Sequence, residues 1–406
     1  MSENNFTALK SKNNIKQQRQ NKHMFNLQEY IKSTKVFVIF SFVVAMIMPI
    51  LAPYLKSVGF SDVTLSLLFA IFPLAAIIIS PIIGKISDEI GRNKIIFIGI
   101  VIEIAALILY GLGLNTWTIV IARIFDAIAG IILGVLALAK VEDHLSNKSR
   151  GKFAGISLSI QSAAGMIAPL IGGFLADYFF IKAPFILGIV ILGILLFMIK
   201  EPKRKKQKTK ISKKDFNWLS EIKEFLSYKK LRGMAILGFV FNTMNPAIVL
   251  FLPILITEYM GLSYFHVGLA YAALSAAHIL QFIFGKWADR SAYKVIMIGS
   301  IISGTCAILI GRSFTFTLLL IVLFIRGIGN SMWNVSAWTL MSKIGEKIKL
   351  EGEIVGSYLS ITKFGSLISY LASGFIVAMF GIRNLFAVTG TIIVIGAAIA
   401  FFFLKE

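Results

Sequence analysis

Residues 36–55 read VFVIFSFVVAMIMPILAPYL, a run of twenty residues without one charged side chain. A helix rises 1.5 Å per residue, so a run of this length crosses the hydrocarbon core of a bilayer, which is about 30 Å thick. The run is continuously apolar, whereas the strands of a membrane β-barrel alternate apolar and polar residues. Because backbone groups in lipid must find their partners within the segment, the run is predicted to be a membrane-spanning helix.

Eleven further apolar runs follow the first. The twelve predicted spans are residues 36–55, 62–83, 95–114, 117–139, 153–176, 183–199, 233–257, 264–284, 295–311, 314–341, 354–380 and 384–404. Only 15% of the 406 residues are charged, against about 25% in an average soluble protein, which excludes a soluble enzyme. We therefore predict an all-α polytopic membrane protein, whose first span is an uncleaved anchor because it is longer than the core of a signal peptide.

The net charge of +21 would by itself indicate nucleic-acid binding. With a cytoplasmic amino terminus, however, 34 of the 41 basic residues fall on the cytoplasmic side, and only Lys56, Lys182, Arg312 and Arg383 fall on the other. This asymmetry follows the positive-inside rule. We predict a multi-pass protein of the cell (cytoplasmic) membrane with both termini in the cytoplasm. Its helices are expected to contact the lipid bilayer, and no nucleic-acid partner is expected.

The chain contains an internal repeat. Residues 84–88 read GKISD and residues 285–289 read GKWAD, 201 positions later, while Arg123 is echoed by Arg326 at an offset of 203. Parallel repeats of this kind place a substrate site near the membrane midplane, between two halves that rock against each other. The predicted domains are a basic tail over 1–35, a six-helix bundle over 36–199, a basic linker over 200–232 and a second six-helix bundle over 233–406. The basic linker is interpreted as a topology determinant, with contact to anionic lipid or nucleic acid as the alternative.

The loop between the second and third spans reads GKISDEIGRNK over residues 84–94 and resembles the loop 2/3 signature of the major facilitator superfamily. Gly84, Asp88, Gly91 and Arg92 have the expected spacing, and Asn93 departs from the basic residue common there. The resemblance implies twelve spans in two pseudo-symmetric bundles. It also implies a cytoplasmic gate, in which Asp88 meets the start of the eleventh helix near Glu353. Asp289 is the corresponding residue of this gate motif in the second half. An ordinary solvated turn with a surface ion pair is the alternative.

Two further elements carry the resemblance. Residues 123–127 read RIFDA, similar to the R-x-x-Q-G element of the fourth helix. The fifth span resembles the signature of proton-coupled exporters, G-x-x-x-G-P-x-x-G-G, in Ala164, Ala168, Pro169, Gly172 and Gly173, with both leading glycines replaced by alanine. The resemblance implies a secondary transporter closest to the twelve-helix drug:proton antiporters, with a bend at this motif in the fifth helix.

Ionisable groups are costly within a membrane, so each needs a partner or a function. The spans place six of them deep, namely Glu103, Arg123, Asp126, His278, Arg326 and Lys363. Arg123 and Asp126 share a helix face. Burial favours the neutral form of the Asp126 carboxyl group, whereas the nearby guanidinium favours the ionised form. Asp126 is therefore a candidate to carry the coupling proton, with Arg123 as its modulator. A purely structural ion pair is the alternative. Glu103, on a span that the resemblance places at the periphery, is interpreted as a polar packing residue, and His278 as a hydrogen-bonded core residue, with a functional role as the alternative for each.

The deep charges leave an excess of positive charge near the expected cavity, which favours organic anions or zwitterions over lipophilic cations. The residues that could line this cavity are His278, Arg326, Lys363, Asn242, Asn245, Asn330, Trp333, Asn334 and Tyr358. We predict a proton-coupled exporter that acts as a monomer on a small molecule. Uptake or exchange of an organic anion is one alternative, and a membrane sensor without transport is another. The single cysteine, Cys306, and the absence of zinc, phosphate-loop and serine-elbow motifs predict no metal site, no cofactor and no enzymatic activity.

Overall fold

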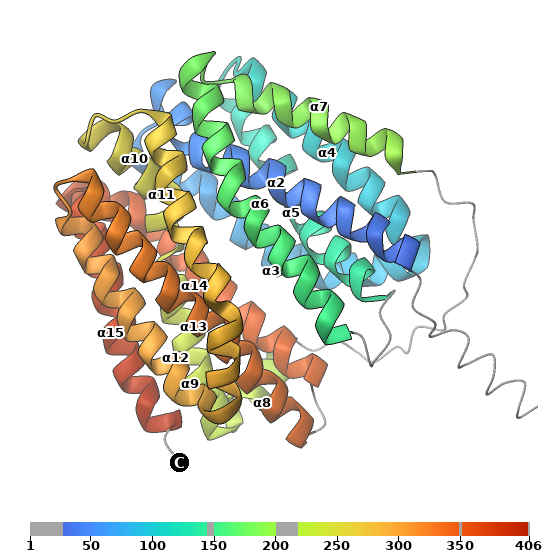
Figure 1. Cartoon of the computed structure of the whole chain (residues 1–406), viewed down its shortest axis with the longest axis vertical. Coiled ribbons are helices and arrows are strands. Elements are labelled where there is room, and N and C mark those ends of the chain that lie inside the picture. The colour runs from blue at the N-terminus through green and yellow to red at the C-terminus, as the bar shows by residue number, and fades with distance from the viewer. Residues whose placement is uncertain (1–26, 144–149, 200–217, 349–350, 405–406) are drawn as a thin grey trace, which may run out of the picture.

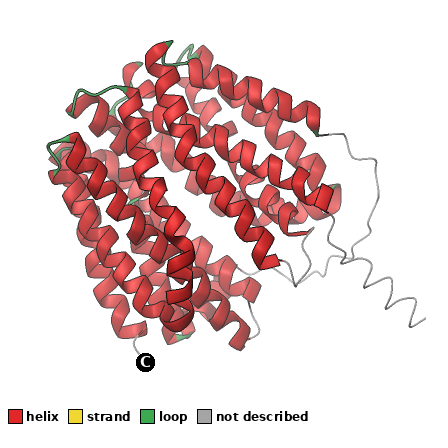
Figure 2. Ribbon diagram, viewed as in Figure 1, coloured by secondary structure: helices red, strands yellow, loops and turns green. Residues whose placement is uncertain are grey.

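The computed structural model describes residues 27–143, 150–199, 218–348 and 351–404. Figure 2 shows that these residues form helices joined by short loops, without a strand among them. The first group of helices comprises α2 (Leu27–Ser57), α3 (Asp62–Ile90), α4 (Arg92–Leu112), α5 (Thr116–Asp143), α6 (Arg150–Tyr178) and α7 (Ala183–Met198).

The second group follows a short amphipathic helix, α8 (Trp218–Ser227), which lies within the predicted linker and buries Phe225. It comprises α9 (Lys229–Asn242), η1 (Ala247–Phe251), α10 (Leu252–Ile254), η2 (Leu255–Tyr259), α11 (Tyr264–Ala276), η3 (Ala277–Leu280), α12 (Gln281–Arg312), α13 (Phe316–Ile348), α14 (Glu351–Phe380) and α15 (Ile382–Leu404). Figure 1 shows the two groups side by side, α2–α7 in blue to green and α9–α15 in yellow to red.

The described helices account for twelve membrane crossings. Ten helical stretches are long and apolar enough to span a membrane, and the shorter apolar α7 adds another. One of the ten, Tyr264–Arg312, has 49 residues, more than twice the length that one crossing needs. It is interrupted at Ser291, whose backbone angles (φ −155°, ψ 78°) are not helical, so it supplies two crossings. The predicted all-α fold is thereby confirmed.

The seventh predicted span, residues 233–257, is not one regular helix as its apolar pattern predicts. Helix α9 ends at Asn242, and the chain continues through two π-helical segments, η1 and η2, around the short α10. Pro246 precedes η1 and Pro253 lies in α10. Proline has no N–H to donate and disturbs the hydrogen-bond ladder, whereas hydropathy reports only how apolar the segment is. The first helix also begins at Leu27, before the predicted start of its span.

Each group has two ends. The short-turn face carries the tight connections α2/α3, α4/α5, α6/α7, η2/α11, α12/α13 and α14/α15, whereas α7 ends and α9 begins at the linker face. The two groups are close at the short-turn face and diverge toward the linker face (Figure 1). Small residues permit this approach: a Cβ on Gly374 of α14 would collide with Ser66 and Val63 of α3, and one on Gly268 of α11 would lie 2.5 Å from the carbonyl oxygen of Pro169 in α6.

Candidate functional site

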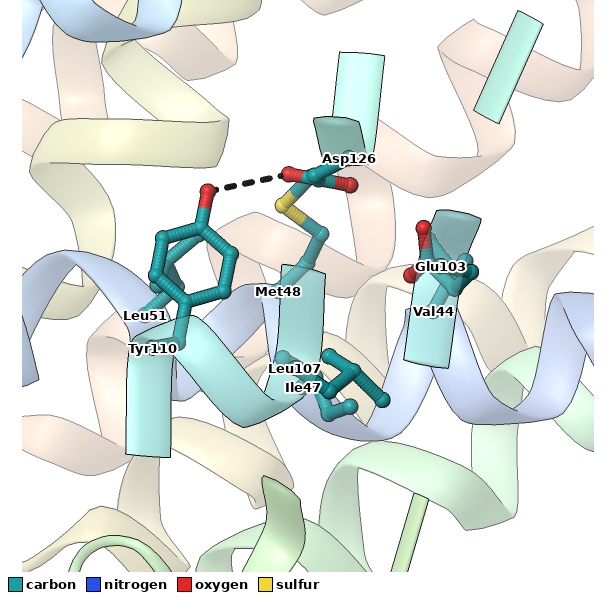
Figure 3. Close-up of a pocket in the computed structure, with 8 residues that line it drawn as sticks. All are labelled: Val44, Ile47, Met48, Leu51, Glu103, Leu107, Tyr110 and Asp126. Carbon is teal, nitrogen blue, oxygen red and sulfur yellow. Dashed lines mark hydrogen bonds between the residues drawn. The ribbon is translucent and has the colours of Figure 1, made fainter. Parts of the chain in front are cut away.

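A buried ion pair forms the centre of the first group. Arg123 and Asp126, one turn apart on α5, are 2% and 7% exposed, and the Arg123 guanidinium pairs with the Asp126 carboxylate. The hydroxyl group of Tyr110 on α4 donates a hydrogen bond of 3.2 Å to the same carboxylate oxygen, as the dashed line in Figure 3 shows. Asp126 therefore has two donors within the first group.

Glu103 belongs to the same site, although the resemblance predicts a peripheral position for the third span. Its side chain is 3% exposed, and it lines a small pocket with Tyr110 and Asp126 (Figure 3). One of its carboxyl oxygens, Oε2, has no hydrogen-bond partner within the described residues. Hydropathy could not reveal this juxtaposition, because it depends on how α4 is rotated against α5.

Arg123 also connects the site to the second group. Its Nε donates to the carbonyl oxygen of Leu68 at 3.4 Å, and its guanidinium lies 4.4 Å from the centre of the Phe69 ring, both on α3. The Phe69 ring in turn contacts that of Tyr370 on α14, with 6.2 Å between the ring centres. A chain of contacts thus runs from Asp126 across the boundary between the groups.

Arg326 on α13 is the counterpart of Arg123 in the repeat, and its surroundings differ. It is 5% exposed, has no acidic partner within the described part of the chain, and its Nε donates to nothing there. Lys363 on α14 lies 5.6 Å from the centre of the Phe72 ring on α3, across the boundary between the groups. Two of the predicted cavity residues are therefore cations that no described carboxylate neutralises.

The other predicted cavity residues fall into three clusters. The Nδ1 atom of His278 lies 3.2 Å from the carbonyl oxygen of Ser275, and its Nε2 atom lies 3.3 Å from Asn330, so both ring nitrogens have a partner. Asn245 donates to Asn242 at 3.1 Å and to Ser366 of α14 at 2.7 Å.

The third cluster is aromatic. The Trp333 ring stacks on Phe241 with 4.1 Å between their centres, and Tyr358 packs on Gly238 of the same helix as Phe241. The Trp333 Nε1 and the Tyr358 hydroxyl group have no partner within the described residues. Asn334, next to Trp333, is half-buried. Two buried hydrogen-bonding groups, one on α13 and one on α14, are therefore left without a partner among the described residues.

The predicted cytoplasmic gate is described only in part. Gly91 ends α3 and begins α4 with a φ of +98°, a conformation that favours glycine, and its N–H donates to the carbonyl oxygen of Ser87 at 3.0 Å. Arg92 is half-buried. Gly84 lies within α3, and the side chains of Asp88 and Glu353 lie outside the described part of the structure. Asp289 is exposed, and its backbone carbonyl oxygen accepts a hydrogen bond of 2.9 Å from Lys343.

The predicted helix-bending motif lies where α6 meets two other helices. A Cβ on Gly172 would collide with the backbone of Met46 in α2, and one on Gly173 would collide with that of Tyr264 in α11. Pro169 and Ala168 are buried inside α6, and Ala164 is half-buried. The glycines therefore allow α6 to approach both groups of helices closely.

Sequence reasoning missed one feature at the short-turn face. The Asp177 carboxylate at the end of α6 accepts backbone N–H groups from Tyr264 (2.9 Å) and Phe265 (2.7 Å), at the start of α11 in the other group. Nearby, Lys56 pairs with Asp62 at 2.5 Å. Helix amino termini favour carboxylates, but sequence spacing alone gives no indication that residues 177 and 264 meet.

No three potential metal-ligating side chains gather within the described ranges. Comparison with protein families finds a match to the Major Facilitator Superfamily model over residues 36–347 and 276–406. An uncharacterised MFS-type transporter of Methanocaldococcus jannaschii is 27% identical over 348 residues, which cover 84% of this chain and 89% of that protein. The quinolone resistance protein NorA of Staphylococcus aureus is 29% identical over 187 residues, 44% of this chain and 47% of NorA.

Solved structures resemble the whole fold. A mutant of the nucleoside transporter NupG has a TM-score of 0.78 and 15% sequence identity, and covers 94% of this chain and 100% of its own. A POT family transporter in complex with 5-aminolevulinic acid has a TM-score of 0.75 and 14% identity over 95% of this chain and 99% of that one. At such identities the similarity establishes the architecture alone.

Proposed function

The chain belongs to the major facilitator superfamily, and on that premise we propose that it is a proton-coupled secondary transporter that exports a small molecule by alternating access. The observation that carries the proposal is the buried group of ionisable residues in the first bundle, Arg123, Asp126 and Glu103. Moving one charge through 100 mV supplies about 2.3 kcal/mol, so one proton per cycle sustains a substrate gradient of tens-fold. The partial match to NorA supports export of a drug-like compound.

The cargo is proposed to be anionic or zwitterionic. Arg326 and Lys363 have no described acidic partner, and the buried Trp333 Nε1 and Tyr358 hydroxyl group have no described hydrogen-bond partner. A lipophilic cation would add a third positive charge to this region. The same charges support the second candidate, uptake or exchange of an organic anion, in which substrate and proton move together. A sensor without transport is the third reading, and it predicts no flux at all.

The conformation is proposed to be closed to the outside. By the positive-inside rule the short-turn face is extracellular, and the contacts of Asp177 with α11 and of Gly374 with α3 lie there. In the opposite conformation we propose that the Asp88 motif holds the linker face shut. The protein is proposed to work as a monomer in the cytoplasmic membrane, with both termini in the cytoplasm.

The test is reconstitution of the purified protein into liposomes with an imposed pH gradient. A fluorescent quinolone, a set of organic anions and a set of lipophilic cations serve as probes. Export predicts accumulation of a zwitterionic or anionic probe against its gradient when protons flow in the opposite direction, and uptake predicts accumulation when they flow in the same direction. Movement of cations only would refute the charge argument, and no flux of any probe would favour the sensor.

The role of Asp126 has its own test. Asp126→Asn removes the charge and leaves the shape, so gradient-driven accumulation should fall at least about tenfold while exchange of labelled for unlabelled probe continues. The measurement compares the two fluxes in the same liposomes. Asp62→Asn, which removes a carboxylate at the short-turn face, is the matched control and should keep both fluxes. Unchanged proton-driven accumulation in Asp126→Asn would remove this residue from the coupling mechanism.

A further inference from the structure

The pocket beside Asp126 is unlike a substrate site. It is lined by residues of α2, α4 and α5 only, all within the first group, namely Val44, Ile47, Met48, Leu51, Glu103, Leu107, Tyr110 and Asp126 (Figure 3). Its free space is about 10 Å³, which is room for one water molecule at most. A drug-sized molecule occupies several hundred cubic ångströms, so this pocket serves something much smaller.

The charges around the pocket do not balance if both carboxyl groups are ionised. None of the eight lining residues is a cation, and Arg123, which lies beside them, already pairs with Asp126, which also accepts a hydrogen bond from the Tyr110 hydroxyl group. Glu103 has an oxygen without any described donor. A buried carboxylate without donors costs far more than a buried neutral acid. The arrangement favours an ionised Asp126 and a neutral Glu103.

We propose that Glu103 and Asp126 hold one proton between them, and that in this conformation the proton is on Glu103. The inference deepens the proposed function and rests on it for the role of this proton in coupling. A hard metal ion suits this pocket less well than a proton. Such ions take six or more oxygen ligands, and five of the eight residues that line the pocket are apolar. Two carboxyl groups at one buried site share a proton because both cannot be ionised cheaply.

The contacts of Arg123 connect the site of the proton to the second group of helices. Arg123 joins the Asp126 carboxylate to the Phe69 ring, and Phe69 contacts Tyr370 of α14. If Phe69 loses its contact with Tyr370 when the groups rock, and the Arg123 side chain then turns away from Asp126, the carboxylate loses its cation and Asp126 becomes the better site for the proton. The transfer moves one proton from a Glu103 oxygen to an Asp126 oxygen and leaves the total charge unchanged.

The test is infrared spectroscopy of the purified protein in lipid nanodiscs, which detects the carbonyl band of a protonated carboxyl group and its shift in heavy water. The wild type should show such a band at neutral pH, and Glu103→Gln should lack it. Glu258→Gln, which removes an exposed carboxylate, is the matched control and should keep the band. An identical band in the wild type and in Glu103→Gln, or no band in the wild type at neutral pH, would overturn the proposal.

A second variant tests whether Glu103 and Asp126 share one proton. In Asp126→Asn, Glu103 becomes the one carboxyl group left for Arg123, so its band should vanish at neutral pH and return on acidification. A band that persists at neutral pH in this variant would show that the two groups do not share a proton. Because Glu103→Gln mimics the neutral acid, it should also fold with unchanged thermal stability, and a large loss of stability would contradict a neutral Glu103.

Transport separates this inference from the proposed function. With the fluorescent quinolone as probe, Glu103→Gln should keep exchange and lose gradient-driven accumulation by at least tenfold. If the wild type moves none of the probes but the infrared band behaves as expected, the proposed function fails and the protonated Glu103 stands. If the wild type accumulates a probe and Glu103→Gln does so equally, the proton on Glu103 takes no part in coupling.

Discussion

Arg123 and Arg326 occupy equivalent places in the two halves, 203 positions apart, but their surroundings differ. At the same offset Glu103 corresponds to Cys306 and Asp126 to Gly329, so neither of these two acidic residues has an acidic counterpart in the second half. Arg123 is bound to Asp126, whereas Arg326 keeps an Nε without a described acceptor. The difference favours a division of labour, in which the first arginine serves the protein's own charges and the second is available to a ligand.

Helix packing explains why the second half has no acidic residue at the position of Asp126. A Cβ on Gly329 would lie 2.8 Å from the backbone carbonyl oxygen of Gly299 and 2.7 Å from the Ser303 hydroxyl group, both on α12. Helices α12 and α13 therefore touch where α4 and α5 leave room for a carboxylate and a small pocket. Close approach of two helices and a buried ion pair exclude each other at this position.

Replacement of each arginine by methionine should have the largest and most unequal effects. Arg123→Met leaves Asp126 buried without its cation, which typically costs about 3–5 kcal/mol of folding stability. Arg326→Met removes a charge without an acidic partner and should be neutral or stabilising. Thermal unfolding of the two variants in the same detergent measures the difference, and Arg123→Met with Asp126→Asn should recover much of the loss. Equal destabilisation by both single variants would contradict the contrast between the two sites.

The loop motif is expected to contribute unequally to transport in the two halves. Asp88→Ala should abolish transport in liposomes while the protein stays folded, because the resemblance assigns this residue to the gate at the linker face. Asp289→Ala, at the equivalent place in the second half, should retain most of the flux, since its side chain is exposed and the chain there turns at Ser291 rather than at a glycine with positive φ. Full transport by Asp88→Ala would refute the gate.

Gly329→Ala tests the packing argument. A methyl group there would force α12 and α13 apart, and overpacking of this kind costs about 1–3 kcal/mol. Gly134→Ala on α5 is the matched control: no atom lies within 4 Å of a Cβ at this position, so the substitution should be neutral or slightly stabilising by helix propensity. Thermal unfolding compares the two variants, and an equal response would mean that α12 and α13 can separate without cost.

The sequence predicted the fold better than the site. Apolar runs and the repeat indicated twelve helices, because lipid allows few alternatives to a helix. The i, i+3 spacing indicated that Arg123 and Asp126 share a face, since both lie on one helix. It did not indicate that Glu103 joins them or that Asp177 reaches Tyr264, because these contacts depend on how separate helices rotate and pack. The interruption of the seventh span escaped as well, since hydropathy does not register the two prolines.

The last and smallest effect concerns the contact between the two halves at the short-turn face. Asp177→Asn loses the charge and one of the two acceptors that hold the amino terminus of α11, a change of about 1 kcal/mol, or roughly a fivefold shift in population toward the conformation open at this face. With Cys306 replaced by alanine, spin labels at Val58 and Phe314, both exposed there, would report the shift as a longer distance. Asn115→Ala is the matched control, because Asn115 holds the start of α5 through Thr118 at 2.9 Å entirely within the first half. An unchanged distance in Asp177→Asn would mean that the approach of α6 to α11, rather than this carboxylate, keeps the face closed.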